Sequence, residues 1–182
     1  MRRIRILIAD DHGIVRKGLR LQLEQNEAFE IVGEAAEGRE AVRLSEELLP
    51  DVVIMDIAMP NLNGIQATAQ LVKKNPQIAV IILSMYSDET YLTRTLAAGA
   101  KGYLLKESAD QDLDKAVEAV AQGKPFFSPA IANTLLEDYM LTSTELGNTA
   151  TAVFWEGNQV IQYQNEPQKA QTKEYFRFSC AV

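Results

Sequence analysis

Apolar runs and segments of helical periodicity alternate along the first 121 residues of the chain. Runs such as 52–55 and 78–83 are unbroken by polar residues, which is typical of strands buried on both faces of a sheet. The pattern predicts strands at 4–9, 29–35, 52–55, 78–83 and 102–105. It predicts helices at 12–25, 38–49, 65–74, 88–98 and 109–121, several of which end beside a Gly or Pro.

Five successive strand–helix pairs predict an α/β fold. Strands joined through helices run parallel, and right-handed crossovers place the helices on both faces of the sheet. The carboxyl ends of the strands then share one edge, where open α/β sheets bind their ligands. The polar residues at the predicted strand ends are Asp10, Asp11, Asp56, Ser84 and Lys106. We expect these residues to converge at that edge, although they lie far apart in the sequence.

The chemistry of this set indicates phosphoryl transfer. Neighbouring carboxylates at Asp10, Asp11 and Asp56 would raise one another's pKa, and a bound divalent cation removes that repulsion. Oxygen ligands favour Mg²⁺. Lys106 supplies a positive charge, and the Ser84 hydroxyl is short enough to reach a phosphoryl oxygen. Phosphoryl transfer needs mainly positioning and charge neutralisation, and a carboxylate can itself accept the group.

Each residue of the set also has a plainer interpretation. The aspartates can be turn or capping residues, the serine a helix cap and the lysine a surface residue. The joint occurrence of suitable groups at four strand ends favours the functional interpretation. His12 is interpreted as a helix-start residue rather than a ligand, because no second His or Cys lies nearby in the sequence.

Composition excludes some other classes of function. The 182 residues are 47% hydrophobic, enough for a real core, and the formal net charge is −7. This charge provides no general attraction to nucleic acid or to an anionic membrane. No apolar run approaches the ~20 residues of a membrane span. The one cysteine, Cys180, excludes an internal disulfide, so we expect a reducing, cytoplasmic setting.

The strand-end motifs resemble those of the receiver domain of two-component response regulators. They are Ile8-Ala9-Asp10-Asp11-His12, Met55-Asp56-Ile57-Ala58-Met59-Pro60 with Gly64, Leu83-Ser84, and Gly102-Tyr103-Leu104-Leu105-Lys106. The resemblance covers residues 1–125, and the first and last motifs are similar to the LuxR/NarL type. It implies a flavodoxin-like, five-stranded parallel sheet in the order 2-1-3-4-5, with helices on both faces.

The resemblance also implies a role for each site residue. Asp56 would accept a phosphoryl group from a sensor histidine kinase, and Lys106 would pair with that group. Ser84 and Tyr103 would form a switch pair. The Mg²⁺ ligands would be Asp10, Asp11, Asp56 and the backbone carbonyl of Ala58. Glu107 departs from the proline that many receivers carry after the lysine.

The remaining residues are expected to form a linker at 126–140, with a helix at 129–140, and an atypical tail at 141–182. Residues 141–146 resemble the opening of the helix-turn-helix domain of LuxR-type regulators, and the likeness then ends. Short strands are predicted at 153–155 and 160–163 around Gly157-Asn158. The 42 residues after Met140 are too few for that domain, and their three basic and four acidic residues give a charge of −1. DNA is therefore not expected as a partner of this chain.

Two questions stay open at this point. The tail is either a new terminus produced by a shifted reading frame or a genuine output or docking element. The chain is expected to be a phosphorylation-controlled switch with at most slow self-catalysed chemistry, and a homodimer on phosphorylation is one candidate assembly. The alternatives are a transcription regulator that binds DNA through the tail, and a Mg²⁺-dependent phosphohydrolase. Such hydrolases usually have a second aspartate two residues after the nucleophile, where this chain has Ala58.

Overall fold

The computed structural model describes residues 2–129, 131–132, 150–156 and 159–165. The chain divides into two compact units, Met1–Ile131 and Ala132–Val182. In the described residues no helix is both long enough and apolar enough to cross a membrane.

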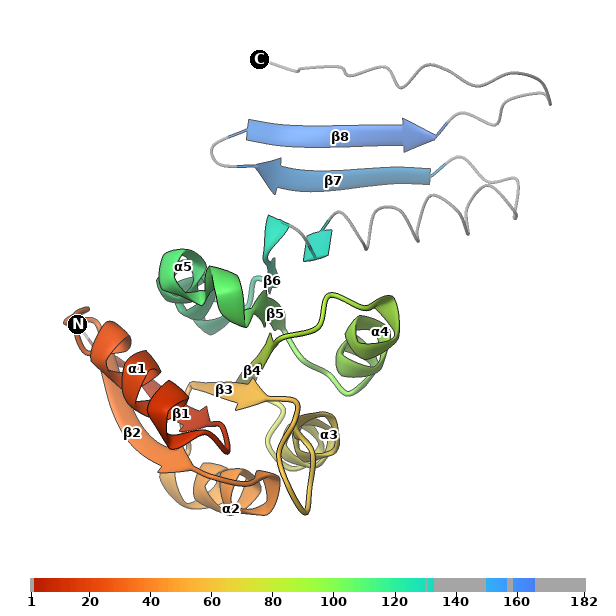
Figure 1. The fold of residues 1–182 in the computed structure, drawn as a ribbon. Helices are drawn as coiled ribbons and strands as arrows, with labels where there is room; N and C mark the ends of the chain where they lie inside the picture. Colours follow the sequence, from red (N-terminus) through yellow and green to blue (C-terminus); the bar gives the residue numbers. More distant parts are fainter. Residues whose placement is uncertain (1, 130, 133–149, 157–158, 166–182) are drawn as a thin grey trace. The chain divides into compact units, whose positions relative to one another are not determined.

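The first unit is built on a parallel sheet in the order β2-β1-β3-β4-β5-β6 (Figure 1). The strands are β1 (Ile4–Ala9), β2 (Phe29–Ala35), β3 (Val52–Asp56), β4 (Ala79–Ser84), β5 (Gly102–Leu105) and β6 (Phe126–Phe127). The predicted five-stranded core and its 2-1-3-4-5 order are confirmed. The prediction missed β6, which is defined by backbone pairing alone. Phe126 N donates to the Lys101 carbonyl at 3.0 Å, and Ser128 N donates to the Tyr103 carbonyl at 3.1 Å.

Five α-helices cover the two faces of this sheet in the first unit (Figure 1). They are α1 (Gly13–Leu23), α2 (Gly38–Leu48), α3 (Gly64–Lys74), α4 (Glu89–Ala97) and α5 (Ala109–Ala121). Their ends lie within two residues of the predicted ends. Side-chain caps explain two starts, because Asn63 accepts from Gln66 N and Asp88 accepts from Thr90 N. A 3₁₀ turn, η1 (Lys106–Ser108), links β5 to α5.

The core lies on both sides of the central strand, β3, all five residues of which are buried. One apolar cluster joins the sheet to α1 and α5. Leu19 and Leu23 come from α1, and Leu113, Val117 and Val120 come from α5. Within the sheet, β3 also pairs with β1 on one side and with β4 on the other. Packing and pairing together fix the position of its carboxyl end.

The segment that follows β3 is pressed against the starts of two helices. A methyl group on Gly64 would lie 1.9 Å from the carbonyl oxygen of Asp56, and one on Gly38 would lie 2.1 Å from that of Leu62. Gly64 N also donates to the Ile57 carbonyl at 3.0 Å. Glycine at both positions therefore permits the close approach that fixes the backbone beside Asp56.

The second unit contains an antiparallel hairpin of β7 (Ala150–Glu156) and β8 (Gln159–Asn165). This confirms the two strands predicted around positions 157 and 158 and makes both of them longer. Pro129, Ile131 and Ala132 are helical, in agreement with the start of the helix predicted at 129–140. The rest of that helix, and the segment 141–146 that resembles a helix-turn-helix opening, lie outside the described residues.

Candidate functional site

The residues predicted at the strand ends meet at one edge of the sheet. Asp10 follows β1, Asp56 ends β3, Ser84 ends β4 and Lys106 follows β5. Asp10, Asp56 and Ser84 are 1%, 3% and 1% exposed. Such nearly complete burial of two carboxylates requires compensating charge or hydrogen bonds.

Lys106 supplies that compensation by bridging the two buried carboxylates. Its Nζ lies 2.7 Å from Asp10 Oδ2 and 2.8 Å from Asp56 Oδ1. Burial lowers the pKa of Lys106, but the hydrogen bonds with Asp10 and Asp56 outweigh this effect and raise the pKa overall. Lys106 therefore stays protonated at neutral pH and remains a fixed cation between the two acids.

Asp56 uses its second oxygen to accept a hydrogen bond from Ala58 N at 3.0 Å. Burial raises the pKa of Asp56, and the nearby charge of Asp10 adds to this effect. The hydrogen bonds from Lys106 and Ala58 oppose it, yet the pKa remains raised. A partly desolvated carboxylate with so few donors is a better nucleophile than a fully hydrated one.

Asp11 and His12 lie on the more exposed side of the same cluster. His12 is the N-cap of α1, as predicted, and its N–H donates to Asp10 Oδ1 at 2.8 Å. Its ring Nδ1 lies 2.7 Å from Asp11 Oδ1, a contact that was not predicted. One ligand atom from each of Asp10, Asp11 and His12 falls within a 4.8 Å group.

This donor set fits a hard divalent cation. Asp10, Asp11 and Asp56 contribute three carboxylates, and Lys106 is the cation that bonds to two of them. The negative charge left over and the oxygen donors suit Mg²⁺, which binds carboxylate oxygens and keeps several of its waters. The backbone N–H of Ala58 donates to Asp56 Oδ2, which places Ala58 beside the site, and the role of its carbonyl as a ligand stays a prediction.

Ser84 and Tyr103 meet at the backbone of Tyr86. Tyr86 N donates to Ser84 Oγ at 2.9 Å, and the Tyr103 hydroxyl donates to the Tyr86 carbonyl at 2.7 Å. The Tyr103 side chain is fully buried, and burial raises its pKa, with the Ser84 hydroxyl partly opposing that effect. The Tyr86 ring stacks on Tyr91 of α4, with ring centroids 4.9 Å apart. The contact with Tyr86 was not predicted.

Sequence reasoning also missed Arg16, whose Nη1 donates to the Asp10 carbonyl at 2.7 Å. The only signal in the sequence is an arginine one turn into the helix that follows the acidic pair. Exposed helices carry many arginines, so this signal does not distinguish Arg16 from Lys17 or Arg20.

The family model for the response regulator receiver domain matches residues 6–118. The chain belongs to this receiver family. The match confirms the resemblance drawn from the strand-end motifs, and it includes all the residues of the buried edge. Members of the family act mainly as signal transducers rather than as enzymes, and they typically use Mg²⁺.

Two curated relatives of this receiver are named as transcriptional regulatory proteins. The chain is 42% identical over 137 residues to the transcriptional regulatory protein DegU of Brevibacillus brevis, a match that covers 75% of this chain and 58% of DegU. It is 39% identical over 133 residues to the transcriptional regulatory protein YdfI of Bacillus subtilis, which covers 73% of this chain and 62% of YdfI. The chain thus spans less than two thirds of the length of these relatives.

Solved structures of the LuxR type share the fold. A two-component response regulator of the LuxR family from Aurantimonas sp. SI85-9A1 has a TM-score of 0.73 at 36% identity, covering 75% of this chain and 98% of that chain. The signal receiver domain of a response regulator NarL from Mycobacterium tuberculosis has a TM-score of 0.65 at 32% identity, covering 68% of this chain and all of that one. The LuxR/NarL type expected from the sequence is therefore supported.

Proposed function

We propose that this receiver is a phosphorylation-controlled switch in which Asp56 accepts a phosphoryl group from the histidine of a sensor kinase. The observation that supports this most is the setting of Asp56, buried at the end of β3 between Lys106 and the Ala58 N–H. An oxygen of Asp56 attacks the phosphorus, the new O–P bond forms as the P–N bond to the kinase histidine breaks, and the histidine takes up a proton.

The chain's own residues supply positioning and charge for this transfer. Lys106 pairs with Asp56 before the reaction and can pair with a phosphoryl oxygen after it, because its Nζ already lies 2.8 Å from the acceptor carboxylate. Asp10, Asp11, Asp56 and the Ala58 carbonyl would hold Mg²⁺, which when bound neutralises charge on the phosphoryl oxygens. Self-catalysed uptake and loss of the group would be slow compared with a metabolic enzyme.

The direct test is phosphorylation of the full chain by a small-molecule phosphodonor with Mg²⁺. Intact-mass measurement should show one added phosphoryl group per chain, and chelation of the metal should prevent the addition. Absence of any addition under conditions that label another receiver would contradict the proposal.

Removal of Asp11 is expected to weaken Mg²⁺ binding strongly. Asp11 is the more exposed carboxylate of the cluster, it belongs to the three-residue group around His12, and Lys106 does not neutralise it. We expect Asp11→Ala to lower the Mg²⁺ affinity measured by calorimetry by about tenfold or more. Asp112→Ala on α5, which removes the same charge from an ion pair with Lys115, is the matched control. Unchanged affinity in Asp11→Ala would exclude Asp11 as a ligand.

Ser84 and Tyr103 are proposed as the switch that reports phosphorylation. Ser84 Oγ now accepts a hydrogen bond from Tyr86 N, and turning it toward a phosphoryl oxygen would break that bond. The Tyr103 ring is already buried, so the switch would stabilise an arrangement that the unphosphorylated chain can adopt. Ser84→Ala is expected to remove about 1–3 kcal/mol of coupling between phosphorylation and self-association, measured by sedimentation. Gln77→Ala, exposed beyond the opposite end of the sheet, should leave the coupling unchanged.

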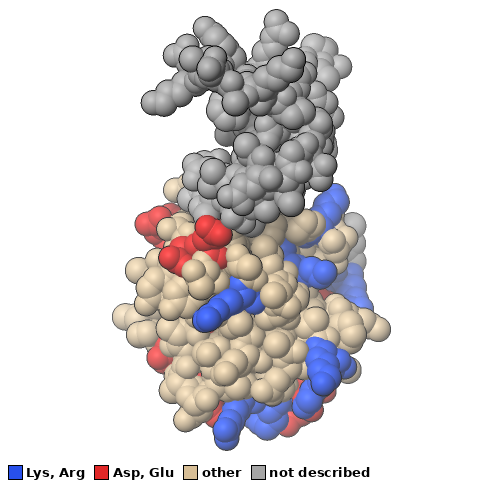
Figure 2. Space-filling model, turned by 90° about the vertical axis from the view of Figure 1, so that its right-hand side faces the viewer, with Lys and Arg blue, Asp and Glu red and all other residues tan. Residues whose placement is uncertain are grey.

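Specific DNA binding is not expected of this chain. One solved relative is described as RcsB dimers bound to two parallel DNAs, and the chain covers 79% of it at 29% identity with a TM-score of 0.68. Here, however, the residues after Met140 have a charge of −1, and the whole chain has −7. On the face shown in Figure 2, Lys and Arg side chains are interspersed with acidic and uncharged residues. Major-groove recognition needs phosphate contacts from basic groups.

Fluorescence anisotropy of phosphorylated protein with a promoter pool at low salt tests this expectation. The titration should show only weak binding. Tight, salt-sensitive binding that is lost when residues 141–182 are removed would instead support the transcription-regulator alternative.

A further inference from the structure

Arg16, on the first turn of α1, contacts the main chain of the acidic loop between β1 and α1. Its Nη1 donates to the Asp10 carbonyl oxygen at 2.7 Å. A methyl group on Gly13 would lie 3.6 Å from Nη2 of the same guanidinium. The guanidinium therefore lies alongside the loop from Asp10 to the start of the helix. Its side chain is only 20% exposed, so water competes weakly for this charge-assisted hydrogen bond.

A carboxylate on β2 holds the guanidinium in place. Arg16 Nε donates to Glu34 Oε2 at 3.3 Å, and the other oxygen of Glu34 accepts from Arg20 Nε at 2.6 Å. Arg20 is tied in turn to Glu24 at 2.8 Å along α1. The hydrogen bond from Arg20 lowers the pKa of Glu34, so this carboxylate is charged at neutral pH. Glu34 thus orients two arginines, of which Arg16 is the one bonded to Asp10.

Asp10 is fixed at four points. Its N–H donates to the Ala35 carbonyl at 3.2 Å, and its carboxylate accepts from His12 N and from Lys106 Nζ. The bond from Arg16 is the fourth, and it fixes the carbonyl, from which the chain continues to Asp11. We infer that Arg16 is a positioning residue for the metal site, because holding the Asp10 carbonyl sets the direction in which Asp11 presents its carboxylate to Mg²⁺. This inference rests on the function proposed for the site.

Positioning and simple charge repulsion predict opposite effects when Arg16 is replaced. A cation beside a carboxylate cluster repels Mg²⁺, so loss of its charge alone would strengthen Mg²⁺ binding. Loss of a group that orients a metal ligand typically weakens metal affinity about 10- to 100-fold. We therefore expect Arg16→Gln to weaken Mg²⁺ binding about tenfold, even though it removes a positive charge.

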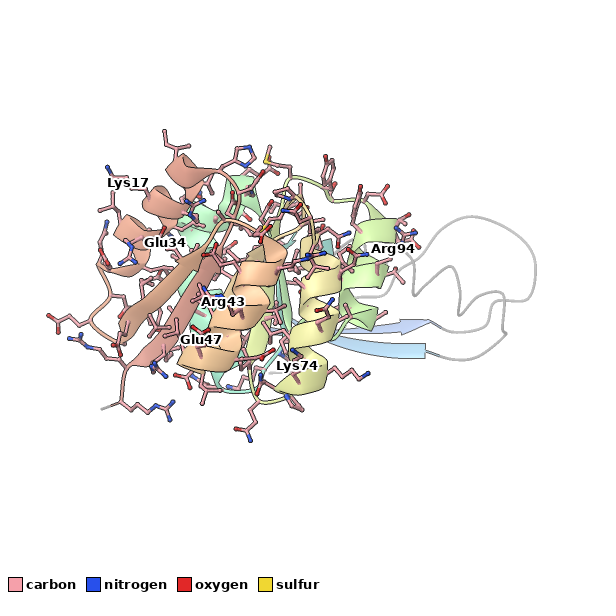
Figure 3. The ribbon with its side chains drawn as sticks, turned by 90° about the horizontal axis from the view of Figure 1, so that it is seen from below. Lys17, Glu34, Arg43, Glu47, Lys74 and Arg94 are labelled. Atoms are coloured by element: carbon pink, nitrogen blue, oxygen red, sulfur yellow. The ribbon has the colours of Figure 1, made fainter. Side chains whose placement is uncertain are left out.

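The experiment compares the full chain with four variants by Mg²⁺ calorimetry. Arg16→Gln removes the contact, and Arg16→Lys keeps the charge but loses the planar fork that reaches Asp10 and Glu34 together. Arg20→Gln removes a cation of α1 that bonds to one oxygen of Glu34 but not to Asp10, and it leaves the other oxygen of Glu34 to bond to Arg16. Arg43→Gln makes the same charge change on α2, where Arg43 pairs with Glu47 at 2.7 Å (Figure 3). A second measurement follows hydrogen exchange at the His12 amide in metal-free protein, since this amide bonds to Asp10 Oδ1.

We expect weaker Mg²⁺ binding and faster His12 exchange in Arg16→Gln, an intermediate affinity in Arg16→Lys, and no change in the Arg20 and Arg43 variants. Equal or tighter binding by Arg16→Gln, or unchanged His12 exchange, would overturn the inference. Should Arg16→Gln fail to fold, Arg16→Lys decides: a weakened affinity supports positioning, and wild-type affinity refutes it. If the wild-type chain itself binds no Mg²⁺, the proposed function fails, and the exchange result still shows whether Arg16 holds the loop.

Discussion

Asp56→Asn is expected to abolish phosphoryl uptake. The amide that replaces the carboxylate carries no charge and is a very poor nucleophile, so the rate of labelling by a small phosphodonor should fall at least about 1,000-fold. The variant also removes the anion that lies 2.8 Å from Lys106 Nζ, which leaves Asp10 as the remaining carboxylate partner of that lysine. Intact-mass measurement should show one phosphoryl group on the wild-type chain and none on the variant.

Asp51→Asn provides a control at the other end of β3. Asp51 lies directly before β3, and Asp56 is its last residue. Both variants therefore make the same replacement of a carboxylate by an amide, at opposite ends of one strand. Asp51 pairs with Arg2 at 2.7 Å and accepts from Arg5 N at 2.9 Å, far from the buried edge. The Asp51→Asn variant should therefore take up one phosphoryl group, as the wild-type chain does. Stoichiometric labelling of Asp56→Asn would show that another residue is the acceptor.

The fold could be predicted largely because its strands are buried. A strand such as β3, with all five residues inside, leaves an unbroken apolar run, and the helices between such runs have clear boundaries. β6 gives no such signal, since it has only two residues and both are half-buried. It forms because the neighbouring Lys101 and Tyr103 carbonyls accept from Phe126 and Ser128. Pairing of this kind depends on where β5 lies in space.

The convergence of the site could also be predicted, but its supports could not. Topology brings Asp10 and Lys106 within 2.7 Å of one another across 96 residues of sequence, as the strand-end pattern implied. The contact of Arg16 with Asp10 and that of Tyr103 with Tyr86 both end on backbone carbonyls. Every residue has a carbonyl, so no residue type marks the acceptor, and only the folded geometry shows which one is used.

Gly64 is packed so tightly against the backbone beside Asp56 that one added methyl group should strongly destabilise the protein. The added methyl group of Gly64→Ala would lie 1.9 Å from the Asp56 carbonyl oxygen and 3.1 Å from the Ile57 Cα. Both are backbone atoms, so no side chain can rotate away, and either β3 or the start of α3 has to move. We expect a loss of about 3 kcal/mol or more in the free energy of unfolding. Denaturation followed by helical circular dichroism measures this loss, because all the described α-helices with stated bounds belong to the first unit.

Gly18→Ala is the matched control, because it adds the same methyl group in the interior of a helix. No atom lies within 4 Å of the methyl position at Gly18. Only the higher helix propensity of alanine should therefore change the free energy of unfolding. That change should stabilise the chain by about 0.5–1 kcal/mol, opposite in sign to the effect at Gly64. The shift forced by Gly64→Ala acts on the residue that carries the acceptor carboxylate, so the folded fraction of this variant should also be phosphorylated more slowly than wild type. Equal stability and equal labelling in Gly64→Ala would mean that the backbone beside Asp56 can yield at little cost, and that the tight packing there is not what holds the acceptor in place.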